Sequence, residues 1–124
     1  VTQGIYEINN PNEASPVMVT TNFALTYFIV SGEIEASRVP SYLLIKDSEG
    51  LSVMTAWAAG KFAGDDVGMF VKKSGIEEKI KKKEVIIPGY AAAIAGDMEE
   101  ELPGWKITVG PREAAHLPAF LKSK

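Results

Sequence analysis

Hydrophobic positions follow two different periods along the chain. Short apolar runs at 16–20, 41–46, 84–87 and 105–109 have the length and β-branched content of strands. Between them, apolar residues recur at helical spacing over 23–37, 51–62, 67–73, 90–102 and 112–122, with one or two further helical turns over 76–81. Strands that alternate with helices predict right-handed βαβ units and a mostly parallel sheet. We therefore expect a three-layer α/β fold with helices on both faces of the sheet.

The first fifteen residues differ from the rest because Asn9, Asn10, Pro11, Asn12 and Glu13 form a cluster typical of turns. We interpret residues 1–15 as a linker from an upstream domain and residues 16–124 as the α/β domain. The alternative is that the apolar residues within 5–8 add an edge strand to the sheet. The chain opens on valine without a methionine, so we expect it to be a piece of a longer protein.

The stretch 47–62 connects a buried strand to a helix that is rich in small residues. Residues 47–50, DSEG, have the composition of a tight turn. Leu51, Met54, Trp57, Ala58 and Phe62 then recur at helical spacing, which predicts that they face the core. The alanines and the glycine between them would let a large flat ligand approach the backbone.

Similar turns follow the other three predicted strands, at 20–23, 88–91 and 110–113. Thr21 and Asn22 are typical helix caps and are expected to accept hydrogen bonds from the first amides of the next helix. Because the carboxyl ends of parallel strands meet at one edge, the four turns predict a ligand crevice there. Their residues are mainly Thr, Ser, Asn, Gly, Ala and Pro, which favour the binding of a large, mostly neutral cofactor over acid–base catalysis.

Composition narrows the possible functions. A length of 124 residues fits one domain, and the absence of cysteine excludes disulfides, thiolate-bound zinc and iron–sulfur clusters on this chain. The net charge of -3 argues against nucleic-acid binding, and no apolar run has the ~20 residues of a membrane span. No glycine-rich phosphate-binding motif is present. The single histidine, His116, is expected to be a buried, hydrogen-bonded or surface residue and not a catalytic base. The lysines at 72–83 are either a docking surface for an acidic partner or anion, or a solvated helix face.

Three long strings in the sequence resemble a known family. TTNFALTYF, GLSVMTAWAAGKF and IPGYAAAIAG are similar to the C-terminal domain of the large (gamma) subunit of corrinoid iron–sulfur proteins, of the CO dehydrogenase/acetyl-CoA synthase system. The resemblance extends from about residue 4 to 122. It implies a flavodoxin-like or Rossmann-like domain that binds a cobalamin-type corrinoid. The four-iron cluster of that family would belong to an upstream domain that is absent from this chain.

The resemblance also implies a function as a methyl carrier. Proteins of this family take a methyl group from methyltetrahydrofolate, through a methyltransferase, onto Co(I) and deliver it to acetyl-CoA synthase in the reductive acetyl-CoA (Wood–Ljungdahl) pathway. The expected partners are a small barrel-containing subunit that covers the corrin, the methyltransferase, acetyl-CoA synthase and a reductive activator. Neither nucleic acid nor a membrane is expected, and the location would be cytoplasmic.

The family's corrinoid contacts carry over onto four segments of this sequence. Leu51 and Met54 retain the alternative role of core residues at helical spacing, and Thr55 is expected nearest the lower face of the ring. The implied contacts are Thr21, Asn22, Thr26 and Tyr27 in the first segment, Leu51, Ser52, Val53, Met54 and Thr55 in the second, Pro88, Gly89, Tyr90 and Ala91 in the third, and Gly110, Pro111, Arg112, Glu113 and Ala114 in the fourth.

One motif of other corrinoid carriers is missing. The DxHxxG sequence that supplies a histidine to cobalt in carriers of the methionine synthase type is absent. A strong axial nitrogen stabilises oxidised cobalt, so its absence favours Co(I). We therefore expect a base-off corrinoid with no protein ligand to cobalt. The alternative is a flavodoxin-like module that binds a small ligand or a partner without corrinoid, whereas a hydrolase is disfavoured because no nucleophile is paired with a base.

Overall fold

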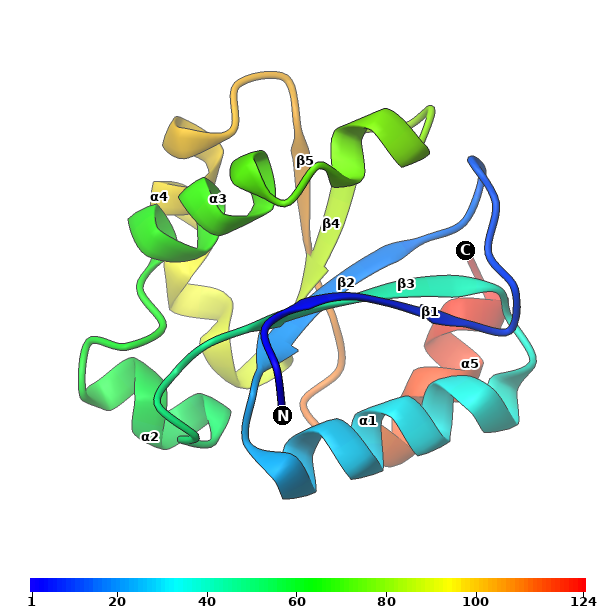
Figure 1. Ribbon diagram of the computed structural model, residues 1–124, viewed down its shortest axis with the longest axis horizontal. Coiled ribbons are helices and arrows are strands. Elements are labelled where there is room, and N and C mark those ends of the chain that lie inside the picture. Colours follow the sequence, from blue (N-terminus) through cyan, green and yellow to red (C-terminus); the bar gives the residue numbers. More distant parts are fainter.

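Five strands form one sheet at the centre of the computed structural model, which describes residues 1–124 (Figure 1). The strands are β1 (Gly4–Ile8), β2 (Val17–Thr21), β3 (Ser41–Lys46), β4 (Glu84–Ile87) and β5 (Lys106–Val109). Their order is β1-β3-β2-β4-β5, with β1 antiparallel to β3 and the other pairs parallel. The connection order of the parallel strands reverses between β2 and β4, as in flavodoxin-like folds.

The four strands predicted from apolar runs are confirmed within one residue at each end. The fifth, β1, lies in the segment expected to be a linker and pairs with β3 from Gly4 opposite Ile45 to Ile8 opposite Ser41. The alternative of an edge strand is therefore what the structure shows for these residues. Asn9 and Asn10 reverse the chain after β1 with φ of 61° and 59°, a region that asparagine tolerates better than most residues. An upstream domain before residue 1 stays a prediction.

Helices cover both faces of the sheet (Figure 1). One face carries α1 (Ala24–Ser37) and α5 (Leu117–Lys122), and the other carries α2 (Val53–Ala58), α3 (Gly64–Lys73) and α4 (Ala95–Glu101). Short 3-10 helices occur at η1 (Ile76–Lys79), η2 (Gly89–Ile94) and η3 (Ala114–His116). None of the helices combines the length and apolar character of a membrane span.

Three helices differ in length or type from those predicted from the sequence. The helix expected over 51–62 is limited to α2, and the helix expected over 90–102 begins as the 3-10 segment η2 before α4. Pro118 lies in the first turn of α5, where its missing amide hydrogen breaks no helical hydrogen bond. The helix expected over 112–122 is therefore replaced by the 3-10 turn Ala114–His116 followed by α5, which begins at Leu117.

The core lies in two layers because side chains alternate along each strand. Val17, Val19 and Leu44 pack under α2, α3 and α4, whereas Met18, Leu43 and Ile45 pack under α1 and α5. This arrangement confirms the three-layer α/β fold. It also leaves the carboxyl edge of the sheet bordered by loops from both layers.

Candidate functional site

A groove of about 290 Å³ opens at the carboxyl edge of the sheet, beside the neighbouring strands β2 and β4. This is the switch point at which open α/β sheets bind ligands. A second hollow of about 370 Å³ lies at the opposite edge, where Lys82, Lys124 and Glu84 meet. No residue predicted for the site lines that second hollow, so the groove at the switch point is the better candidate.

The groove brings together residues from all four predicted segments. Nine of the predicted site residues line it: Thr26, Val53, Met54, Pro88, Tyr90, Gly110, Pro111, Arg112 and Ala114. Sequence reasoning missed six others: Met18, Val19, Thr20, Val30, Ile87 and Leu117. Val30 follows Thr26 by one helical turn, so this member could have been found from the helical period. The members of β2 and β4 come from the strands themselves, because the groove reaches below their ends.

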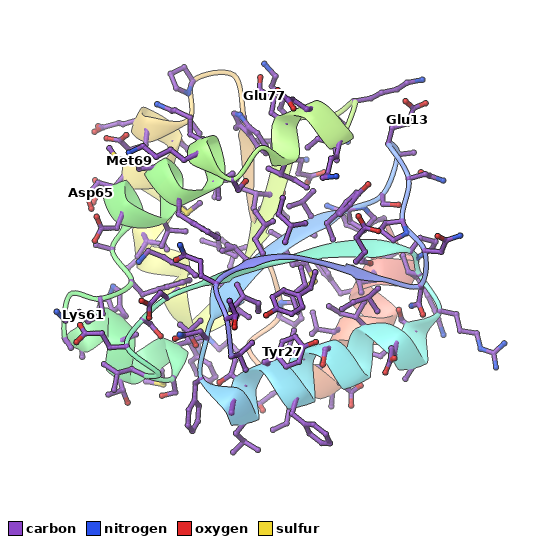
Figure 2. All side chains as sticks on the ribbon, in the orientation of Figure 1. Glu13, Tyr27, Lys61, Asp65, Met69 and Glu77 are labelled. Carbon is purple, nitrogen blue, oxygen red and sulfur yellow. The ribbon has the colours of Figure 1, made fainter.

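The other predicted site residues do not line the groove: Thr21, Asn22, Tyr27, Leu51, Ser52, Thr55, Gly89, Ala91 and Glu113. Tyr27 points from α1 toward the sheet, and its ring centroid lies 5.1 Å from that of Tyr6 in β1 (Figure 2). Thr55 is exposed on α2 and its hydroxyl is 3.2 Å from the hydroxyl of Ser52. Contact between these residues and a larger ligand that extends beyond the groove stays a prediction.

The α2 segment corrects the helical-period prediction. Ala56 and Phe62 are buried, but 56% of Met54 and 46% of Trp57 are exposed, and Ala58 is also exposed. The expected apolar stripe therefore splits between the core and solvent, and the alternative of Met54 as a core residue is wrong. Of the two exposed large side chains on α2, Met54 lines the groove and gives it an apolar rim.

Close packing of the third and fourth loops shapes one end of the groove. A Cβ atom at Gly89 would lie 2.7 Å from the backbone nitrogen of Arg112 and 2.8 Å from the carbonyl oxygen of Gly110. The Gly110 amide donates a hydrogen bond to the Ile87 carbonyl at 2.8 Å. Glycine at position 89 thus allows the loop after β5 to rest against the loop after β4.

Charged groups border the groove only at this end. The Arg112 guanidinium lies 5.7 Å from the centroid of the Tyr90 ring, a cation–π contact. The Tyr90 hydroxyl donates a hydrogen bond to Glu113 at 3.0 Å, and this hydrogen bond raises the pKa of the phenol above its ordinary value. Arg112 faces the groove and remains able to donate hydrogen bonds to a ligand.

Neither Thr21 nor Asn22 caps α1, so that prediction is wrong. Phe23 occupies the N-cap position and no side chain accepts a hydrogen bond from the first turn. Thr21 is the last residue of β2, and its fully buried hydroxyl has no hydrogen-bond partner. Such a group costs about 1–3 kcal/mol of stability. Asn22 instead directs its amide across the sheet edge to the turn after β3.

The single histidine lies close to the groove in sequence but not in its lining. Ala114 and Leu117 line the groove, whereas His116, between them, is exposed. No group of three or more side chains of the metal-binding types is close enough to hold a metal ion. The lysines of the 72–83 region are largely exposed, and Lys81 and Lys83 pair with Glu13 and Glu77 at 2.9 and 2.7 Å.

The strand order and the groove define the class of protein: a flavodoxin-like α/β domain with a groove at the switch point, where such folds bind ligands. Comparison with known families then identifies the chain, because the model of the CO dehydrogenase/acetyl-CoA synthase delta subunit family matches residues 1–121. The chain belongs to this family.

Its relatives are named for the large or gamma subunit. The chain is 48% identical over 123 residues to the corrinoid/iron-sulfur protein large subunit of Moorella thermoacetica. The aligned region covers 99% of this chain and 27% of the Moorella protein. It is 42% identical over 121 residues to the acetyl-CoA decarbonylase/synthase complex subunit gamma of Methanothermobacter thermautotrophicus. That alignment covers 98% of this chain and 26% of the relative. The chain thus spans about a quarter of these relatives, and the resemblance noted in the sequence is confirmed.

Proposed function

We propose that this chain is the corrinoid-binding domain of a methyl carrier in a CO dehydrogenase/acetyl-CoA synthase system. The observation that carries the proposal is the groove at the switch point, where nine of the residues implied by the resemblance meet. The names of the relatives, which refer to corrinoid, iron–sulfur and acetyl-CoA decarbonylase/synthase, support the same conclusion. The methyl donor would be methyltetrahydrofolate, through a methyltransferase, and the acceptor would be acetyl-CoA synthase.

The chemistry of the groove fits a corrinoid. Its lining is mostly apolar, as suits the flat ring, and its polar groups include the hydroxyls of Thr20 and Thr26 and the guanidinium of Arg112. These groups can donate hydrogen bonds to the amide side chains that surround a corrin. A corrinoid is larger than about 290 Å³, so part of it would rest on the rim formed by the exposed side chains of Met54 and Tyr90. That rim would leave its outer side open to a second protein surface, such as the small subunit.

When bound, the corrinoid would supply a cobalt centre that accepts a methyl group as Co(I) and releases it to the acceptor. The residues of this chain would bind and orient it without providing a cobalt ligand. The groove lining contains no histidine, and the segment from Ser52 to Thr55 offers hydroxyl groups, which are weak ligands. Weak axial donors favour the lower oxidation state, by the same principle that tunes haem iron.

The test is spectroscopic. The chain is mixed with hydroxocobalamin, separated from free cofactor by gel filtration, reduced to Co(II) and examined by EPR. We expect cobalamin to co-elute with the protein and to show a base-off spectrum without nitrogen splitting. Nitrogen splitting that disappears in His116→Ala would contradict the absence of a protein ligand. Failure to retain cobalamin, alone or with the small subunit, would favour the alternative of a small-ligand or partner-binding module.

A further inference from the structure

The side-chain amide of Asn22 makes five hydrogen bonds, all to segments other than its own. Its oxygen accepts from the backbone amides of Ser48 and Gly50, each at 3.0 Å, and from the Ser48 hydroxyl at 3.1 Å. Its nitrogen donates to the Asp47 carboxylate at 3.1 Å and to the Val1 carbonyl at 3.2 Å. One residue at the end of β2 thereby holds most of the turn that follows β3.

This turn needs external support because its backbone is unfavourable. Glu49 has a φ of 59° and Gly50 a φ of 76°, so two consecutive residues adopt the left-handed region. That conformation is unfavourable for a residue with a side chain such as Glu49. Within the turn, the Leu51 amide donates to the Ser48 carbonyl at 3.2 Å and the Glu49 amide donates to Asp47 at 2.8 Å. The amides of Ser48 and Gly50 are satisfied by Asn22.

The turn is connected directly to the groove. Ser48 is buried, and its one hydroxyl hydrogen is shared between the Asn22 oxygen at 3.1 Å and the Leu51 carbonyl at 2.8 Å, which ties the turn to the residues that enter α2. Val53 and Met54, at the start of α2, line the groove. The helix has six residues and no side-chain cap, so its own hydrogen bonds contribute little to fixing its position.

We propose that Asn22 is a positioning residue that holds the 47–51 turn and, through it, sets where Val53 and Met54 stand in the groove. The family resemblance implied direct corrinoid contact for Asn22, whereas its side-chain oxygen and nitrogen both form hydrogen bonds within the protein. An aspartate could not replace it, because a carboxylate would face Asp47 at about the 3.1 Å now spanned by a hydrogen bond. The effect of Asn22 on corrinoid binding rests on the proposed function, whereas its role in holding the turn does not.

The experiment compares Asn22→Ala with Ser37→Ala. Ser37 is a matched control because its buried hydroxyl also bridges two backbone groups, the Ile34 carbonyl at 2.6 Å and the Val39 amide at 3.1 Å, at the opposite edge of the sheet. Amide hydrogen exchange is measured residue by residue on the purified chain, together with its affinity for hydroxocobalamin and its unfolding in urea.

We expect Asn22→Ala to accelerate exchange at Ser48 and Gly50 at least tenfold, with the strands of the sheet unchanged, and to weaken hydroxocobalamin binding about tenfold. Ser37→Ala is expected to lower the urea midpoint without either effect. Unchanged exchange at Ser48 and Gly50, or an acceleration spread over the whole sheet, would overturn the proposal.

Two further outcomes are separable. If Asn22→Ala does not fold, Ser48→Ala removes only the hydroxyl link to Asn22 and Leu51, and we expect the same local pattern at smaller amplitude; no local change would overturn the proposal. If the wild-type chain binds no cobalamin, either alone or with the small subunit, the proposed function fails, and the exchange pattern alone decides whether Asn22 holds the turn.

Discussion

Gly89 provides a quantitative test of how the groove is built. An added Cβ would lie 2.7 Å from the Arg112 nitrogen, about 0.7 Å inside the 3.4 Å at which ordinary contact begins. The atoms it would meet, in Gly110, Pro111 and Arg112, belong to the backbone and cannot turn away as a flexible side chain would. The loop after β5 must therefore move as a unit.

We expect Gly89→Ala to lower the free energy of unfolding by about 1–3 kcal/mol, the usual cost of overpacking a tight contact. Gly96 is a matched control, because it lies in α4 and a Cβ there would meet nothing within 4 Å. Gly96→Ala should raise the free energy of unfolding by about 0.5–1 kcal/mol, since alanine loses less conformational freedom in a helix. The two variants carry the same chemical change and should shift stability in opposite directions.

The assay is urea unfolding followed by tryptophan fluorescence, with hydroxocobalamin affinity measured on the folded proteins. Gly89→Ala should also weaken cobalamin binding, because Gly110, Pro111 and Arg112 line the groove. Gly96→Ala should leave the affinity unchanged. If Gly89→Ala were as stable as Gly96→Ala and bound cobalamin equally well, the close approach of the two loops would not be what shapes the groove.

Three further predictions follow from buried and exposed groups elsewhere. Thr21→Val should raise the free energy of unfolding by about 1 kcal/mol in urea titrations, because it removes a buried hydroxyl without a partner; a loss of stability would mean that the hydroxyl is satisfied in solution. Burial raises the pKa of the Glu84 carboxyl, but hydrogen bonds from Lys124 and Thr108 and the charges of Lys124 and Lys82 outweigh it, so the net shift is downward. A carboxyl with a lowered folded-state pKa stabilises the fold above its unfolded pKa, and this contribution is lost as the pH falls through the folded value. The stability difference between wild type and Glu84→Gln should therefore be largest near pH 7 and shrink below pH 4.5, the ordinary value, and a difference independent of pH would contradict the ionic role. Met54→Ala should change the free energy of unfolding by at most about 0.5 kcal/mol while weakening cobalamin binding, whereas Phe62→Ala should cost about 3–5 kcal/mol; similar losses for both would restore the helical stripe as core.

The sequence alone determined the four parallel strands, though not the edge strand β1, and therefore the edge of the sheet that carries the site. Apolar runs such as SYLLIK and EVII are buried on both sides in a parallel sheet, so they stand out from helices without knowledge of their neighbours. Alternation with helices then implies parallel strands, whose carboxyl ends share one edge. Half of the predicted site residues line the groove, among them Pro88, Gly110 and Arg112, which follow the carboxyl ends of parallel strands at that shared edge.

Only the tertiary structure decided what those residues do. Helical spacing places Met54 and Phe62 on one stripe, but α2 ends at Ala58, so they are not held on one helical face, and one is exposed while the other is buried. Asn22 is a residue type typical of helix caps, yet its side-chain amide forms hydrogen bonds with residues 25–28 positions later in the sequence. The reason is that β2 and β3 end side by side. Local sequence encodes which groups a residue can offer, whereas the partners that it meets are set by chain segments brought together in the folded sheet.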